Sequence, residues 1–273
     1  MKRMFIVCAT IAVMLCSCTK ENFVTDEKVN TISATVPTET KTTIDGLHVT
    51  WSAGDAITAY NYSDPVSKYT LDRGEGTSNA EFYLTSGSGV NADNFRGFYP
   101  FTRDCYTSMI RYSTNIKQDG ILDGEIPMYG DFVNKGDGTY NIQFKHTCGI
   151  VRFVFSGEAS RVEGLNKITV NVGKVYKNAV TILTDGSLAY ERGKGLTDSD
   201  RQIVVNVNPA FPVIGGKKTV DVIMTPGTYT DSSVPVWIYI DSASRNIAKA
   251  PGFNVVAGKI TTINVNLDNI KDL

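Results

Sequence analysis

The stretch KTTIDGLHVTWSAGDAITAY, residues Lys41–Tyr60, decides which fold is expected for the rest of the chain. The dipeptide Asp45-Gly46 suits a two-residue hairpin loop, because both turn positions need a positive φ that Gly and Asp tolerate. The apolar residues after this turn recur at every second position and share one face of a strand: they are Leu47, Val49 and Trp51. Ser52–Asp55 then reverses the chain tightly. We therefore expect Trp51 to end a strand and to close one end of a β-sandwich core.

The same stretch resembles the N-terminal signature of the fimbrillin-like lipoproteins. That signature reads K-T-x-ϕ-D-G-x-x-V-x-W-S-x-G-D-x-I, where ϕ is an apolar residue. The matching positions are Lys41, Thr42, Ile44, Asp45, Gly46, Val49, Trp51, Ser52, Gly54, Asp55 and Ile57. The resemblance covers essentially the whole mature chain, most strongly Lys41–Ile57, and it implies two tandem transthyretin-like β-sandwiches. Because these residues form no catalytic set, the signature indicates a scaffold rather than an activity.

The composition of the 273-residue chain is that of a globular all-β protein. It is 42% hydrophobic and 20% charged, and its many β-branched and aromatic residues alternate with turn residues, which favours strands. Helical periodicity is sustained nowhere for as many as ten residues. A net charge of −1 without a basic stripe gives nucleic-acid binding no electrostatic support.

The N-terminus has the pattern of a bacterial lipoprotein signal. Lys2 and Arg3 precede an apolar run of about 14 residues, which is shorter than the roughly 20 that a membrane-spanning helix needs. The run ends in Leu15–Cys18, which resembles a lipobox with Cys18 as the modified residue. Cys16 fits less well, because a large Leu would precede it. We expect lipidation of Cys18, attachment to the cell outer membrane and exposure at the cell surface; an ordinary secretory peptide is the alternative.

Four segments are expected along the chain: a signal peptide at residues 1–17, a lipidated tether at 18–28, an N-terminal β-sandwich at 29–134 and a C-terminal β-sandwich at 135–273. The glycine turn Lys135–Gly138 marks the boundary between the sandwiches, and Gly157–Gly164 is the second choice. Each sandwich should hold about seven strands. In the C-terminal half, Thr184–Ser187 predicts a hairpin turn between strands at Ala179–Leu183 and Leu188–Tyr190.

The residues that could carry chemistry form no catalytic or metal-binding pattern. His48 and His146 are the only histidines, and neither stands in a metal-ligand spacing. No G-x-S-x-G elbow, P-loop or dinucleotide fingerprint occurs. The candidate carboxylates stand at turn positions, where Asp bonds its own backbone: they are Asp45, Asp55, Asp119, Asp123 and Glu125. We expect a protein that is not an enzyme and that holds no cofactor and no metal ion.

Two cysteines besides Cys18 remain in the mature chain, Cys105 and Cys148. An oxidising envelope would allow a disulfide between them. The boundary at residue 135 places them in different sandwiches, however, and Cys148 opens a hydrophobic strand. Two buried free thiols are therefore expected, with a Cys105–Cys148 bridge as the alternative.

The first and last strands raise the question of assembly. Val29–Val36 predicts a first strand, and Lys259–Leu267 predicts a last one with apolar residues at every second position. Such a strand can complete its own sheet or be added to a neighbour's; we expect the first option in the isolated protein. In polymerising fimbrillin-like proteins, an arginine-specific protease removes the first strand and a donor strand replaces it. Here the first arginine after Cys18 is Arg73, well beyond the first strand.

This departure leaves three alternatives: a pilus subunit matured by another protease, an uncleaved anchor or terminal subunit, or a surface lipoprotein that never polymerises. The resemblance favours a structural or accessory subunit of outer-membrane pili that acts in adhesion, with other pilus subunits as partners. The alternative function is a surface lipoprotein that binds host or dietary glycans. Trp237 and Tyr239 are the candidate stacking residues for such a ligand, since they share one face of an apolar strand. Burial between the domains is the competing interpretation of this pair.

Overall fold

The computed structural model describes residues 31–37, 50–63, 65–107, 109–113, 117–118, 126–171, 179–190, 202–207, 212–229, 235–240, 244–249 and 252–269. Strands make up nearly all of its regular structure, so the prediction of an all-β fold is confirmed. Within these residues the helical segments are α1 (Ala159–Gly164) and the 3-10 helix η3 (Leu267–Asn269), and no helix there is long and apolar enough to cross a membrane. Cys18, the tether and the predicted hairpin at Lys41–Val49 lie outside the described residues.

The strands of the N-terminal half form one sheet that closes on itself. Its order is β10-β1-β4-β3-β2-β5-β9, and β10 pairs with β9 as well as with β1, so each of these seven strands has a neighbour on both sides. The strands are β1 (Thr31–Thr35), β2 (Ala56–Tyr60), β3 (Ser67–Arg73), β4 (Asn79–Ser86), β5 (Arg96–Tyr99), β9 (Met128–Asn134) and β10 (Tyr140–Gln143), and β11 (Lys145–His146) continues beside β9. The expected N-terminal sandwich is thus a closed sheet, which has no edge strand among these seven.

The interior of the closed sheet is filled by large apolar side chains. Period-two alternation turns Ile32 and Ala34 of β1 inward, and Ile57 and Ala59 of β2 join them. The aromatic residues of this core are Trp51, Tyr69, Phe82, Phe95, Tyr99, Phe132, Tyr140 and Phe144. Their burial removes apolar surface from water at about 25 cal/mol per Å², which is the main force that holds the sheet closed.

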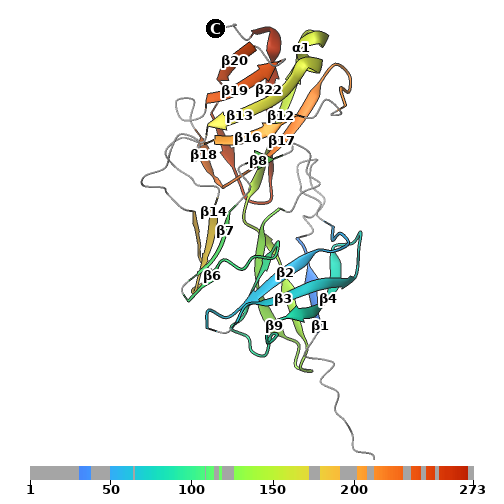
Figure 1. The fold of residues 1–273 in the computed structure, drawn as a ribbon, viewed down its shortest axis with the longest axis vertical. Helices are drawn as coiled ribbons and strands as arrows, with labels where there is room; N and C mark the ends of the chain where they lie inside the picture. The colour runs from blue at the N-terminus through green and yellow to red at the C-terminus, as the bar shows by residue number, and fades with distance from the viewer. Residues whose placement is uncertain are drawn as a thin grey trace, which may run out of the picture.

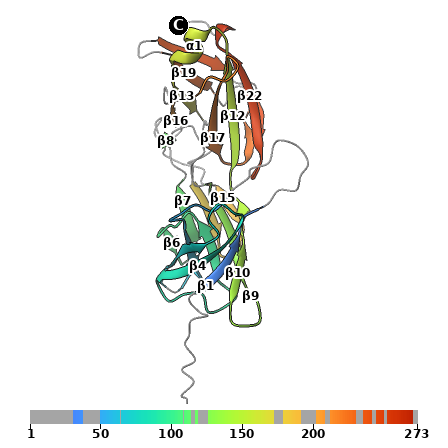
Figure 2. The ribbon, with the colours of Figure 1, turned by 90° about the vertical axis from the view of Figure 1, so that its right-hand side faces the viewer.

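The C-terminal half is a sandwich of two sheets that share one core. One sheet has the order β17-β12-β22 and the other β20-β19-β13-β16-β8. The strands are β8 (Lys117–Gln118), β12 (Gly149–Ser156), β13 (Leu165–Asn171), β16 (Gln202–Asn206), β17 (Lys218–Met224), β19 (Pro235–Ile240), β20 (Ser244–Lys249) and β22 (Ile260–Asn266), with β18 (Gly227–Tyr229) and β21 (Phe253–Val255) as a separate pair. Phe153 and Phe155 from one sheet and Ile168 and Val205 from the other lie in the same buried cluster. Figures 1 and 2 show this sandwich and the closed sheet at opposite ends of an elongated molecule.

The last strand, β22, pairs within its own chain. It runs parallel to β12, in register from Ile150↔Ile260 to Ser156↔Asn266. Its alternation is the one that the sequence predicted, because Ile263 and Val265 are buried while the asparagines between and after them are exposed.

A further sheet contains strands from both halves of the chain. Its order is β15-β14-β7-β6. The strands are β6 (Cys105–Tyr106), β7 (Met109–Ser113), β14 (Ala179–Leu183) and β15 (Leu188–Tyr190). The hairpin predicted around Thr184–Ser187 is therefore present, and Asp185 Oδ1 accepts a hydrogen bond from the Ser187 backbone N–H at 2.8 Å. Figure 1 shows β6, β7 and β14 beside the closed sheet.

The sheets divide the chain differently from the boundary predicted at residue 135. Lys135 donates its backbone N–H to the Thr139 carbonyl at 2.9 Å, which makes Lys135–Thr139 the turn of the β9–β10 hairpin, and both strands belong to the closed sheet. The chain leaves that sheet only after His146, between β11 and β12. A glycine turn has the same local signal inside a hairpin as between domains. The pairing of β10 with β1, which the local sequence does not encode, places the turn within the sheet.

Candidate functional site

The first strand of the closed sheet is the part of the fold that bears most directly on assembly. β1 lies between β4, to which it is antiparallel, and β10, to which it is parallel. Ile32, Ala34 and Val36 are buried in the core, so the strand is held by hydrogen bonds along both edges and by apolar packing. Removing it would leave two unpaired edges and vacated apolar pockets, which is the arrangement that accepts an added strand.

The described part of the signature builds a tight turn rather than a reactive site. Asp55 donates its backbone N–H to the Ser52 carbonyl at 3.0 Å, and its Oδ2 accepts the Ser52 N–H at 2.7 Å. Gly54 has a φ of 84°, a backbone conformation that residues with a Cβ rarely adopt. The other carboxylate oxygen of Asp55 accepts the hydroxyl of Tyr99 at 2.9 Å, which ties the turn to β5.

Trp51 lies at the centre of the aromatic core, with 1% of its surface exposed. Its ring makes edge contacts with Phe82, Tyr99 and Phe144, at centroid distances of 4.9, 5.4 and 5.7 Å. Both backbone polar groups of Trp51 are hydrogen-bonded: its N–H donates to the Thr77 carbonyl, and its carbonyl accepts the Gly76 N–H. Trp51 is therefore a structural residue, while Lys41, Asp45 and Gly46 of the same motif lie outside the described residues.

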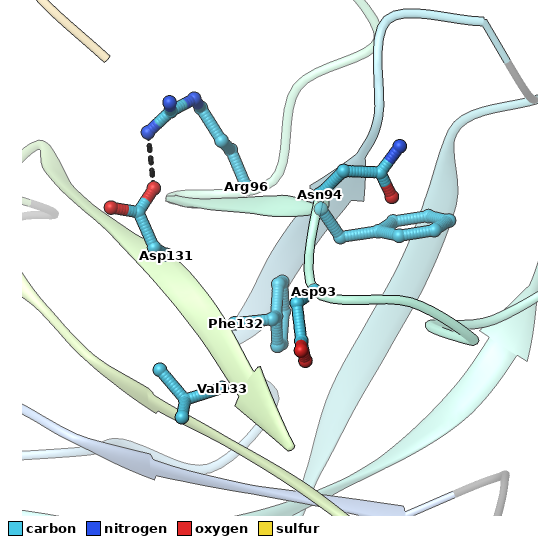
Figure 3. A pocket seen from close by; sticks show the side chains of 7 residues that line it. Asp93, Asn94, Arg96, Asp131, Phe132 and Val133 are labelled. Carbon is cyan, nitrogen blue, oxygen red and sulfur yellow. Dashed lines mark hydrogen bonds and ion pairs between the residues drawn. The ribbon is translucent and has the colours of Figure 1, made fainter. Parts of the chain in front are cut away.

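A surface pocket of about 400 Å³ lies beside the paired strands β5 and β9 (Figure 3). The residues that line it are Asp93, Asn94, Phe95, Arg96, Asp131, Phe132 and Val133. Arg96 forms an ion pair with Asp131, and its Nη2 donates to the Thr184 carbonyl at 3.2 Å. Asp93 Oδ1 accepts the Asn134 N–H at 3.1 Å. The pocket offers polar atoms to a small ligand, but its guanidinium and both of its carboxylates already make contacts within the protein.

Sequence reasoning did not find the contacts of Arg96. Arg96 and Thr184 are 88 residues apart. No local pattern marks an arginine on a strand as the partner of a distant turn. The sequence did predict the hairpin around Thr184–Ser187, but it did not predict the surface against which that hairpin packs.

Metal-ligating side chains do not cluster in the described part of the chain. No group of three or more His, Cys, Asp or Glu side chains there could hold a metal ion. His146 is buried at the end of β11, and His48 lies outside the described residues. Trp237 and Tyr239 belong to β19, which runs between β13 and β20. Their side chains are outside what the structure describes, so their role in ligand stacking stays a prediction.

Cys105 and Cys148 are free thiols; Cys148 is buried and Cys105 is partly buried. Burial raises the pKa of both thiols from 9.0 to about 12. For Cys105 the nearby Asp104 carboxylate raises the pKa further, whereas for Cys148 a hydrogen bond from Thr147 opposes the effect.

These thiols predict a loss of stability in alkali. A group whose pKa is raised by folding contributes stability that is full below its unfolded pKa and is lost as the pH climbs to its folded pKa. The free energy of unfolding should therefore fall between pH 9 and 12. At about 1.4 kcal/mol per pKa unit, the buried Cys148 accounts for up to about 4 kcal/mol of this fall. Urea unfolding at each pH measures it. The variant Cys148→Ala should show a shallower decline, and an unchanged decline would contradict the assignment.

The comparisons with known proteins match the chain by fold. No protein-family model matches it, and no curated protein matches its sequence. A candidate cell adhesion protein from Bacteroides ovatus superposes with a TM-score of 0.55 at 14% identity, over 89% of this chain and 95% of its own. One from Bacteroides uniformis gives a TM-score of 0.54 at 14% identity, over 89% of this chain and 94% of its own.

The chain shares the fold of these two proteins. The match runs over nearly the full length of both, so it includes the closed sheet and the C-terminal sandwich together. This fold is consistent with the resemblance to fimbrillin-like lipoproteins at the Trp51 turn.

Proposed function

We propose that the protein is a cell-surface adhesion protein of the fimbrial type, a structural or accessory subunit of outer-membrane pili held by lipid at Cys18. The observation that carries this proposal is the fold shared with two candidate cell adhesion proteins over 89% of the chain. The strand β1, which is paired along both edges, occupies the position that a donor strand would take in a polymer from which β1 had been removed.

The position of the arginines favours a subunit that keeps its first strand. Arg73 is the last residue of β3, so cleavage there would remove β1, β2 and β3 together. Three of the seven strands of the closed sheet would then be lost, rather than one. An uncleaved subunit keeps both its lipid and its closed sheet, as a membrane anchor or terminal subunit requires. Its contacts with other subunits then come from surfaces other than the β1 groove.

Mass spectrometry of the protein purified from its own cells tests the anchor. We expect a mature N-terminus that begins at acylated Cys18 and is continuous through β1. The variant Cys18→Ala should leave the membrane fraction. Cys16→Ala is the matched control, because a small residue two positions before Cys18 suits the lipobox, and it should stay membrane-bound. An unacylated mature protein, or equal behaviour of the two variants, would refute the anchor.

Immunogold electron microscopy of intact cells tests the pilus role. We expect label on surface fibres or at their bases, and loss of the fibres from cells that carry Cys18→Ala. Chemical cross-linking on those cells should join the protein to other subunits. Uniform label on cells without fibres, with only monomer after cross-linking, would contradict a place in pili and favour a surface lipoprotein that does not polymerise.

A further inference from the structure

A segment of the N-terminal half crosses into the C-terminal sandwich. β7 pairs with β14 in the sheet beside the closed sheet, from Met109↔Leu183 to Ser113↔Ala179. Four residues later the same chain forms β8, which runs parallel to β16 with Lys117 opposite Val204 and Gln118 opposite Val205. β8 is thereby the edge strand of a sheet whose other strands all come from beyond residue 164. The chain then returns to the closed sheet as β9.

The C-terminal half makes the opposite excursion. β13 belongs to the sandwich, but the next strands, β14 and β15, form the hairpin that pairs with β7 outside it. The chain re-enters the sandwich as β16 beside β13. Each half therefore contributes a strand to a sheet that also contains strands of the other half, as the positions of β7, β8 and β14 in Figure 1 illustrate.

Apolar packing fixes the hairpin to the outer surface of the closed sheet. Ile182 of β14 is fully buried against Tyr60 of β2 and Phe98 of β5, which point away from the aromatic core. Leu188 of β15 and Tyr129 of β9 pack around this cluster. Both faces of β2 and β5 are thus covered, the inner face by their own half and the outer face by the hairpin.

Two polar contacts fasten the turn of the hairpin. The Tyr62 hydroxyl donates to the Leu183 carbonyl at 2.9 Å, and Arg96 Nη2 donates to the Thr184 carbonyl at 3.2 Å. Arg96 is oriented by its ion pair with Asp131. A Cβ at Gly186 would stand 2.7 Å from Arg96 Nη1, so the guanidinium packs directly against the turn. Glycine is favoured at this position by its φ of 83°, which residues with a Cβ rarely adopt.

We propose that this reciprocal strand insertion makes the two halves unfold as one cooperative unit. The contacts of the β14–β15 hairpin with the closed sheet provide this coupling. The protein then behaves as a rigid two-part rod in which a load applied to one half is carried by both. The inference is independent of lipidation and of any place in pili, because it depends only on pairings and contacts within one chain.

Tryptophan fluorescence can follow one half by itself. The variant Trp237→Phe leaves Trp51, in the core of the closed sheet, as the single tryptophan. In this background, Phe153→Leu weakens the core of the C-terminal sandwich without touching the closed sheet. Urea unfolding is followed both by Trp51 fluorescence and by far-UV circular dichroism. We expect Phe153→Leu to lower the two midpoints by the same urea concentration. A Trp51 midpoint that stays fixed while circular dichroism shows an earlier transition would overturn the proposal.

A second pair of variants tests whether the β14–β15 hairpin couples the two halves. Ile182→Ala combined with Arg96→Ala removes the apolar anchor and one of the polar contacts, and Phe153→Leu should then no longer move the Trp51 midpoint. The matched control combines Ile214→Ala and Arg73→Ala, whose side chains are exposed, Ile214 at 75% and Arg73 at 76%. In the control the two midpoints should still move together. If the two midpoints still moved together after the hairpin contacts were weakened, the hairpin would not be what couples the two halves.

Discussion

Replacing Trp51 by alanine should cost about 3–5 kcal/mol of unfolding free energy, the range for truncating a large buried aromatic side chain. The cavity would open at the meeting point of Phe82, Tyr99 and Phe144, which all contact the indole ring. These partners come from β4, β5 and the residue that follows β10, so the core cannot collapse onto the cavity without moving several strands. Since single domains are stable by about 5–15 kcal/mol, this is a large share of the total. Urea unfolding followed by circular dichroism measures it.

Two controls separate the cavity from a general effect of substitution. Trp51→Phe keeps an aromatic ring in the site and should lose less than half as much stability as the alanine variant. Tyr83→Ala removes an aromatic ring from β4 that is 44% exposed, and it should change the unfolding midpoint much less than Trp51→Ala does. Equal losses for Trp51→Ala and Tyr83→Ala would contradict a central structural role for Trp51.

The second large effect is expected from Gly130→Ala, at about 3 kcal/mol. Gly130 of β9 is directly opposite Gly97 of β5, and both face the interior. A Cβ on Gly130 would lie 2.5 Å from the backbone carbonyl oxygen of Gln143 and 2.9 Å from Ile142 Cγ1. The carbonyl belongs to the end of β10, so relief would need the sheet to open. The φ of Gly130 is not positive, so the cost is steric rather than conformational. Thermal unfolding should show a drop of several degrees.

Gly97→Ala is the matched control for this prediction. It adds the same methyl group to the paired strand, but the nearest atom is Ile142 Cδ1, the far end of a side chain that can rotate away. We expect a loss of about 1 kcal/mol for this variant, at the low end for an overpacked core. The reverse order of the two variants would show that the β9–β10 contact is looser than the structure has it.

Local patterns in the sequence predicted the elements whose residues are close along the chain. The alternation of β22, the β14–β15 hairpin and the turn after Trp51 follow from spacing and turn chemistry alone. The same local reasoning misplaced the division at residue 135, because the Lys135–Gly138 turn carries no mark of the strand that β10 will pair with. It also left Arg96 without a role, although that residue connects the closed sheet to a hairpin from the other half.

By itself, then, the amino-acid order determined that the chain is all-β, which faces of its strands are apolar and where it turns tightly. Those properties depend on backbone geometry and side-chain size over a few neighbouring residues. Only the tertiary structure decided that β1 lies between β4 and β10, that the first sheet closes, and that the two halves exchange strands. Strand pairing uses backbone groups that every residue carries, so the choice of partner is made by how the apolar faces pack together.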